Sequence, residues 1–405
     1  MSSLRRILNS PLFGNADFKR LWGICGFNSF GMTGEQVVIG SLLFNLTGSS
    51  EWVGIAMALY FLPLAVFGNL SGIIADRMDR RKLLFRIEVL ISLNLVVFAS
   101  LVAFGRVELW LILVLSFASG TLRSMHNPVR ASYTYDLLGG QHVVQALGML
   151  NICIRSGMLA GALDTGAVFE GFGGSMALLS LFGVHLTALV GIVFLKTPGV
   201  STSKVRSSIS ENLREYFLEL RHNRSLLMIV AITGCVEIFG FSFATAMPEL
   251  AEGRFDRGAD GLGILHAARA LGGLTAGLLL ASMVSLKRCG RLYIGVIFLF
   301  GVGMILLALG DTFSLALLAI LLVAMMATSS DILTQSMLQL NVSDHLRGRA
   351  MGTWSLAIGL APVGHLEMGY LIVALGLGGA LMANGLALVL TGLIVLFFLP
   401  GLRKL

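Results

Sequence analysis

The sequence predicts an all-α integral membrane protein with twelve transmembrane helices, arranged as two pseudo-symmetric six-helix bundles with both termini in the cytoplasm. Three observations lead to this prediction: a composition too apolar for a water-soluble fold, twelve stretches long enough to cross a bilayer, and a one-sided distribution of Lys and Arg. Together they place most of the chain in hydrocarbon rather than in water.

Of the 405 residues, 56% are hydrophobic and only 13% are charged, whereas soluble domains carry about 25% charged residues. A soluble fold of this size has no means of burying so much apolar surface, so the surplus must face lipid. The 49 glycines suit transmembrane helices that approach one another closely. The four cysteines lack metal-ligand spacing, and we interpret them as small buried hydrophobic residues: Cys25, Cys153, Cys235 and Cys289.

A spanning helix needs about 20 largely apolar residues, and the chain contains twelve such stretches. They cover residues 22–46, 53–75, 83–104, 109–124, 144–170, 175–195, 226–250, 262–284, 292–309, 313–333, 351–375 and 381–399. The fourth stretch is short and can extend toward Tyr133. Continuous apolar runs exclude a membrane β-barrel, whose strands alternate polar and apolar residues.

The basic residues fix the expected orientation. With the N-terminus inside, 24 of the 29 Lys and Arg residues fall on the cytoplasmic side, and Arg123 and Arg130 are counted among them. The other five are Arg106, Arg254 and Arg257 on the opposite side, and Arg155 and Arg269 within spans. This asymmetry follows the positive-inside rule. Because the basic residues form short clusters between apolar runs, the net charge of +7 indicates topology, not nucleic-acid binding.

The longest polar linker divides the chain into two halves of similar length. We expect an N-terminal six-helix bundle over residues 1–195, a cytoplasmic linker over 196–224 and a C-terminal six-helix bundle over 225–405. Two bundles joined by a basic linker are typical of secondary transporters.

The loop after the second predicted helix carries the strongest motif, GIIADRMDRRK at residues 72–82. It resembles the G-x-x-x-D-R-x-G-R-R signature that the major facilitator superfamily has in the same loop. The match covers Gly72, Asp76, Arg77, Arg80 and Arg81, while Asp79 stands where the family has its second Gly. The resemblance implies the major facilitator fold.

The same resemblance implies a conformational latch formed by these six residues. Gly72 allows close helix approach, and Asp76 at a helix end can meet an arginine or the positive N-terminus of another helix. In the family that partner is the start of helix eleven, which here follows the segment DHLRGR at residues 344–349. The alternative is that the arginines only set topology. The loop at 285–291 looks like a decayed second copy.

The fifth predicted helix contains Gly148, Gly157, Gly161 and Gly166, and this spacing resembles the antiporter signature of the superfamily. The alternative is packing through small residues. With the DRMDRR loop, the whole-chain pattern resembles the exporter group that includes the enterobactin exporter and the macrolide efflux proteins. That resemblance implies export by antiport.

Ionisable residues inside spans are costly unless they face a cavity or a partner. The candidates for proton or substrate binding are Glu35, Asp164, Glu237, His266, Arg269, Asp331 and Glu367. Glu35 and Glu237 lead, because they lie at similar depths in helices one and seven, which line the central cavity in the superfamily. The alternative for each is a structural ion pair with a neighbouring arginine. His365 and Glu367, two residues apart, cannot share a helix face.

These features favour a transporter that exports a small drug-like or siderophore-like molecule against a proton gradient. An uptake carrier for a nutrient or lipid precursor is the alternative, and a non-transporting receptor or enzyme is a remote one. Without nucleotide-binding, metal or nucleophile motifs, we expect neither an enzyme nor a cofactor. The expected partners are the substrate, protons and lipid, and the expected state is a monomer in the inner membrane.

Overall fold

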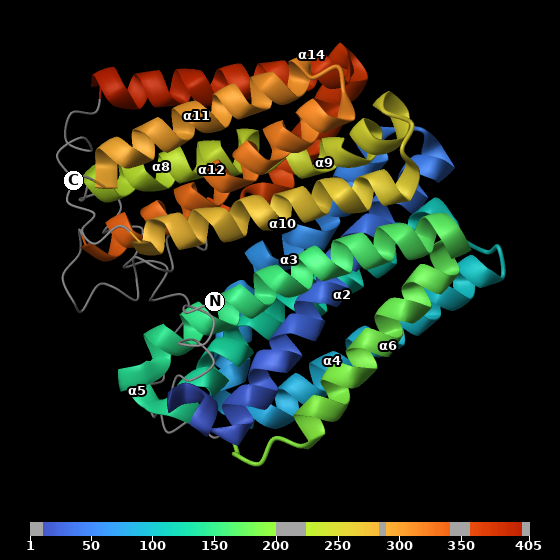
Figure 1. Ribbon diagram of the computed structural model, residues 1–405, viewed down its shortest axis with the longest axis vertical. Helices are drawn as coiled ribbons and strands as arrows, with labels where there is room; N and C mark the ends of the chain where they lie inside the picture. The colour runs from blue at the N-terminus through green and yellow to red at the C-terminus, as the bar shows by residue number, and fades with distance from the viewer. Residues whose placement is uncertain (1–10, 200–223, 283–288, 341–356, 399–405) are drawn as a thin grey trace. The chain divides into compact units, whose positions relative to one another are not determined.

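The computed structural model describes residues 11–199, 224–282, 289–340 and 357–398, and its regular secondary structure there is entirely helical (Figure 1). The helices are η1 (Pro11–Gly14), α2 (Ala16–Thr47), α3 (Ser50–Arg77), α4 (Arg80–Ala103), α5 (Leu109–Phe172), α6 (Gly174–Val193), α8 (Arg224–Phe239), α9 (Phe243–Pro248), η2 (Glu249–Arg254), α10 (Gly258–Ser282), α11 (Cys289–Leu309), α12 (Phe313–Leu340) and α14 (Ala361–Phe398).

Ten helical segments of the described residues are long and apolar enough to cross a membrane. They confirm the expectation of an all-helical membrane protein. The fourth predicted stretch is longer than its apolar core suggests, because the helix runs from Leu109 to Gly139. Arg123 therefore lies within a candidate span and is buried, and its assignment to the cytoplasmic side stays a prediction. Its charge is paired inside unit 1, as described below.

Two glycines mark sharp turns between helices that otherwise run on. Gly139 in α5 has φ 69° and ψ 172°, and Gly376 in α14 has φ 74° and ψ 163°. This region of positive φ is essentially confined to glycine and costs a residue with a Cβ atom about 1–3 kcal/mol. The first turn lies between the predicted spans 109–124 and 144–170, and the second lies between 351–375 and 381–399. Both were expected as helix boundaries.

The described chain forms two compact units. Unit 1 contains the described residues of Met1–Leu42, Val66–Lys204 and Gly258–Ala267, and unit 2 contains those of Leu43–Ala65, Val205–Arg257 and Ala268–Leu405. The boundary that we predicted at 196–224 remains a prediction, since residues 200–223 lie outside the described residues.

In unit 1, α2 crosses the second half of α5 through glycines. A Cβ atom on Gly157 would lie 2.2 Å from the carbonyl oxygen of Gly26, and one on Gly161 would lie 2.2 Å from that of Phe30. These glycines therefore bring two backbones into direct contact. Gly148, by contrast, has nothing within 4 Å of an added Cβ. Part of the antiporter-like spacing thus has a packing role.

Unit 2 uses the same device between α11 and α14. A Cβ atom on Gly301 would lie 2.5 Å from the carbonyl oxygen of Gly385. The large side chains of Tyr293 and Phe300 on α11 are fully buried. Between such closely packed helices, a polar side chain is stable only if a hydrogen-bond or ion-pair partner lies beside it. The buried polar side chains with such partners define the candidate site.

Candidate functional site

Glu35 is fully buried in unit 1 and is held by two side chains of α5. Its Oε2 accepts two hydrogen bonds from Arg123, at 2.9 Å from Nε and 2.7 Å from Nη2. The hydroxyl of Ser119 donates to Oε1, and Asn94 of α4 donates to Ser119 at 2.7 Å. The fork of Arg123 and the carboxylate neutralise each other in an interior that would not hold either charge alone. Glu35, one of the two leading candidates, thus has an arginine as its ion-pair partner, which is the arrangement that the structural alternative predicts.

A second buried pair joins α4 to α6. His185 Nδ1 lies 2.6 Å from Oε1 of Glu88, and both side chains are completely buried. Asn28 of α2 donates to Oε2 of Glu88 at 3.1 Å. The sequence analysis missed this pair, although Glu88 and His185 stand in predicted spans. The signal was available: each is an ionisable residue inside an apolar stretch, and each needs a partner there.

Three nitrogen-bearing side chains lie near the carboxylate of Glu88: those of His185, Arg123 and His126 on α5. The ring of His126 is 2% exposed, and neither of its nitrogens has a hydrogen-bond partner among the described residues. Space for His185 comes from Gly31 of α2, where a Cβ atom would lie 2.0 Å from Nε2 of the ring. Four helices of unit 1 thus enclose one polar core.

Glu237 is the leading candidate in unit 2 and has an acidic neighbour. It is 4% exposed on α8, and Asp331 of α12 is close enough for the two carboxylates to interact electrostatically. One turn away, the hydroxyl of Thr233 lies 3.5 Å from that of Thr334 and links the same two helices. Two carboxylates at one buried place repel each other when both are ionised.

Glu367 and His365 of α14 point to different neighbours within unit 2. Asn384 donates to Oε2 of Glu367 at 3.0 Å and to Ser242 at 3.2 Å. His365 is buried, lies 2.9 Å from the hydroxyl of Thr245 and stacks on Phe61 with ring centroids 5.1 Å apart. The two residues indeed occupy different helix faces.

The remaining candidates differ in burial. Arg269 lies over the ring of Phe243, with its guanidinium carbon 5.6 Å from the ring centroid, a favourable cation–π arrangement. His266 is 4% exposed on α10. Asp164 on α5 is exposed, so it does not share the polar core of unit 1.

The described part of the signature loop joins four segments of unit 1. Asp79 is the N-cap of α4 and accepts from the backbone N–H groups of Arg81 at 2.9 Å and Lys82 at 3.2 Å. A carboxylate at this position stabilises the helix start, so Asp79 has a local structural role at the position where the family has Gly. Arg80 pairs with Asp136 of α5, and its N–H donates to the carbonyl of Gly199. Arg81 donates to the carbonyl of Val193 at the end of α6.

Gly72, Asp76 and Arg77 belong to α3 by their backbone, but their surroundings are not among the features that the structure describes. The proposed latch partner at 344–349 and residues 285–288 of the second loop copy lie entirely outside the described residues. The latch therefore stays a prediction.

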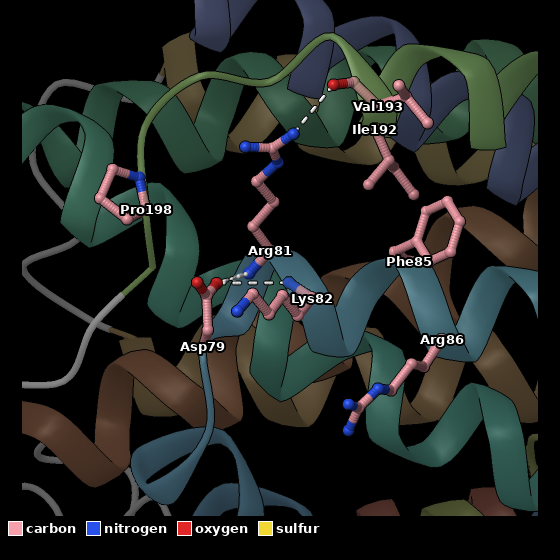
Figure 2. Close-up of a pocket in the computed structure, with 8 residues that line it drawn as sticks. All are labelled: Asp79, Arg81, Lys82, Phe85, Arg86, Ile192, Val193 and Pro198. Atoms are coloured by element: carbon pink, nitrogen blue, oxygen red, sulfur yellow. Dashed lines mark hydrogen bonds between the residues drawn. The ribbon is translucent and has the colours of Figure 1, made fainter.

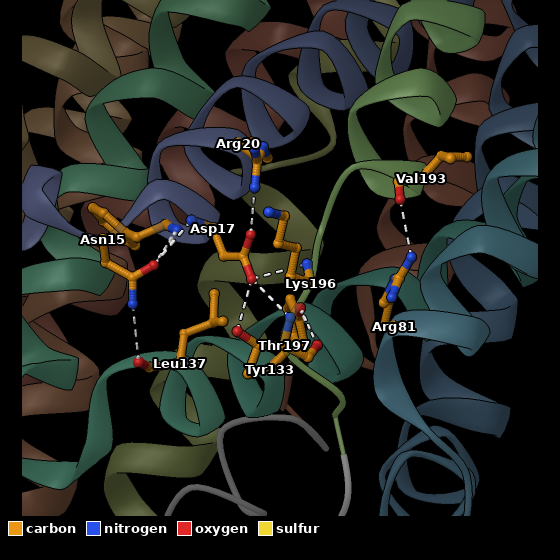
Figure 3. A network of polar contacts seen from close by, with 10 residues as sticks. Asn15, Asp17, Arg20, Arg81, Tyr133, Leu137, Val193, Lys196 and Thr197 are labelled. Carbon is orange, nitrogen blue, oxygen red and sulfur yellow. Dashed lines mark hydrogen bonds and ion pairs between the residues drawn. The ribbon is translucent and has the colours of Figure 1, made fainter.

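Next to the loop, Asp17 gathers donors from the segment that follows α6 (Figure 3). Its Oδ2 accepts from the N–H groups of Lys196 and Thr197 and from the Thr197 hydroxyl, at 2.7–2.9 Å, and Oδ1 pairs with Arg20 at 2.7 Å. Burial raises the pKa of Asp17, but the hydrogen bonds outweigh it and bring the pKa below its usual value. Tyr133 donates to the carbonyl of Thr197.

Among the described residues, no group of three or more His, Cys, Asp or Glu side chains is arranged to hold a metal ion. The sequence matches the family model described as Major Facilitator Superfamily over residues 21–363.

Three curated relatives are similar over much of their length. The chain is 26% identical to an uncharacterized MFS-type transporter, YfiS, of Bacillus subtilis (strain 168), covering 96% of this chain and 95% of that protein. It is 24% identical to macrolide efflux protein A of Streptococcus pyogenes, covering 66% and 67%. It is 22% identical to the staphyloferrin A transporter of Staphylococcus aureus (strain NCTC 8325 / PS 47), covering 82% and 84%.

Solved structures share the fold at low identity. A POT family transporter in complex with 5-aminolevulinic acid superposes with a TM-score of 0.78 at 12% identity, covering 95% of this chain and 96% of that one. A D-xylose-proton symporter gives 0.75 at 15% identity, covering 96% and 99%.

Proposed function

Because the chain belongs to the Major Facilitator Superfamily, we propose that it is a secondary active transporter that exports a small drug-like or siderophore-like molecule in exchange for protons. It works by alternating access with twelve spans. Ten are the candidate spans given above, α2 is the eleventh, and the division of α14 at Gly376 into two spans gives the twelfth. It resides as a monomer in the plasma membrane, with both termini in the cytoplasm.

The interaction between Glu237 and Asp331 carries the proposal of proton coupling. Two ionised carboxylates at one place in a membrane interior are unfavourable, and one shared proton relieves their repulsion. A conformational change that admits water to one of them permits release of that proton. Their helices, α8 and α12, meet at Thr233 and Thr334, so a small shift between the helices changes the spacing of the carboxylates.

Glu35 has a different proposed role, because Arg123 already neutralises it. An anionic or hydrogen-bonding group on the substrate competes with Glu35 for the guanidinium, and the released carboxylate then takes a proton. Glu35 and Arg123 thus couple substrate binding to protonation. Glu367, Asp164, His266 and Arg269 are secondary candidates for contacts along the route, and the residues of the signature loop form the proposed latch.

The direction of transport is proposed as outward. It is supported by the similarity to macrolide efflux protein A. The glycine spacing in α5, which resembles the antiporter signature of the superfamily, also supports it. The staphyloferrin A transporter suggests siderophores as the second substrate class. Uptake of a nutrient or lipid precursor is the alternative. The two are distinguished by whether protons move opposite to the substrate or in the same direction.

The test uses the purified chain in liposomes that enclose a pH-sensitive dye. Under an imposed pH gradient, addition of the macrolide erythromycin or of staphyloferrin A should move protons opposite to the substrate. Glu237→Gln and Asp331→Asn should each abolish this movement. Asp311→Asn, which removes an exposed carboxylate of unit 2, serves as control. Unchanged proton movement in the double variant Glu237→Gln/Asp331→Asn contradicts the assignment, and co-directional movement favours uptake.

A further inference from the structure

A basic cavity of about 450 Å³ opens in unit 1 beside the start of α4 and the end of α6 (Figure 2). Three cationic side chains line it, Arg81, Lys82 and Arg86, against one carboxylate, that of Asp79. The carboxylate is already engaged with the backbone of α4. The cavity therefore presents a net positive charge. Asp79 and Arg81 also belong to the proposed latch, whereas Lys82 and Arg86 have no role in the proposed transport mechanism.

The cations are available to a ligand. Lys82 and Arg86 lie one turn apart on α4 and are both exposed, so they share a face. Within the described ranges neither has an ion-pair partner. Arg81 is held toward the cavity by its 2.9 Å hydrogen bond to the carbonyl of Val193 (Figure 2).

The other wall is apolar. Phe85 is 38% exposed and Val193 is 53% exposed, and Ile192 lies between them at the end of α6. In Figure 2 the ring of Phe85 lies toward Ile192, across the cavity from the basic groups of Arg81 and Lys82. A ligand that fits both walls must carry anionic and apolar parts.

Exposed apolar residues continue from the cavity along the two helices. On α4 they are Leu90, Leu93 and Val97, which follow Arg86 on one face, and on α6 they are Leu179, Leu186 and Val190. The candidate spans Arg80–Ala103 and Gly174–Val193 begin and end at the cavity, and the ends of a membrane-spanning helix lie beside the lipid headgroups. A soluble anion would meet the cations but not these stripes.

We propose that the cavity binds the headgroup of an anionic phospholipid. Its phosphate lies between Lys82 and Arg86, and its acyl chains follow the stripes on α4 and α6. Basic pockets between transmembrane helices recognise such headgroups through short-range charge attraction. The bound lipid would brace the first turns of α4, which also carry Asp79 and Arg80 of the signature loop.

The test measures lipid binding to the full chain and needs no transport substrate. Protein in phosphatidylcholine vesicles is compared with protein in vesicles that also contain cardiolipin or phosphatidylglycerol, and with protein given inorganic phosphate. Retained lipid is counted by native mass spectrometry, and the melting temperature is followed in parallel. We expect retention and stabilisation with the anionic lipids only.

The variant Lys82→Gln/Arg86→Gln should bind anionic lipid about 30-fold more weakly, as expected from about 1 kcal/mol for each cation. Lys19→Gln/Arg106→Gln removes the same charge from exposed positions outside the cavity and should bind as the unmodified chain does. Equal losses in both variants would mean a general surface effect and overturn the proposal. An equal response to inorganic phosphate would overturn the lipid assignment.

Discussion

His185 Nδ1 and Glu88 Oε1 lie 2.6 Å apart in the fully buried core of unit 1, between α6 and α4. Asn28 holds the second carboxylate oxygen, and Gly31 leaves the space that the imidazole ring fills. Residues of a third helix, α2, thus hold the two side chains in place. Their positions matter because a buried charge without a partner costs several kcal/mol.

Removal of either member of this pair should destabilise the protein more than removal of both. Glu88→Gln or His185→Gln leaves one polar group without its partner, at a cost of about 3–5 kcal/mol, and the double variant should recover part of that loss. Gly31→Ala should displace the ring and resemble His185→Gln. Melting temperatures in one detergent give the comparison. Additive losses in the double variant would show that the two side chains do not act as a pair.

Variants of Glu35 and Arg123 should distinguish the contribution of this pair to stability from its contribution to transport. Glu35→Gln leaves the Arg123 guanidinium buried and uncompensated, so the melting temperature should fall, whereas Glu35→Gln/Arg123→Gln should recover stability. If Glu35 also exchanges protons, the double variant is stable but does not couple erythromycin to proton movement. Full coupling in a stable double variant would assign Glu35 a structural role alone.

Asp17 predicts a pH-dependent contribution to stability. Because its pKa is lower in the folded protein than the ordinary value of 3.8, the stabilisation is present above that value and is lost as the pH falls through the folded pKa. Asp17→Asn should cost about 1–3 kcal/mol at pH 7. The difference from the unmodified chain should shrink below about pH 4. Unfolding by denaturant at several pH values measures it, and a difference independent of pH would refute the account.

Glycines of α5 should differ in tolerance according to their surroundings. Gly161→Ala forces a Cβ atom against the Phe30 carbonyl of α2, and overpacking of this kind costs about 1–3 kcal/mol. Gly148→Ala meets nothing and should be neutral or slightly stabilising, because Ala favours a helix. Yield and melting temperature of the two variants test this. Equal tolerance would mean that α2 and α5 can move apart without cost.

The apolar stretches and the signature loop were enough to predict an all-helical membrane protein and its superfamily. This succeeds because the thickness of the hydrocarbon sets the length of each span, independently of its neighbours. Glu35, Glu237 and Asp331 could be identified as candidates for the same reason, since an ionisable residue in an apolar stretch is conspicuous by itself.

Only the tertiary structure decided which of those charges meet. Arg123 stands 88 positions after Glu35, and His185 stands 97 positions after Glu88. Their contact depends on how α2, α4, α5 and α6 rotate and cross, which the glycine contacts at Gly26 and Gly157 help to set. The burial of Arg123 could not be predicted from hydropathy, because a charge in an apolar helix appears unfavourable until its partner, here Glu35, is known. The sequence by itself determined that the chain is a helical membrane protein of this superfamily, because span length and the signature loop are local features; helix packing determined which of the buried ionisable side chains meet.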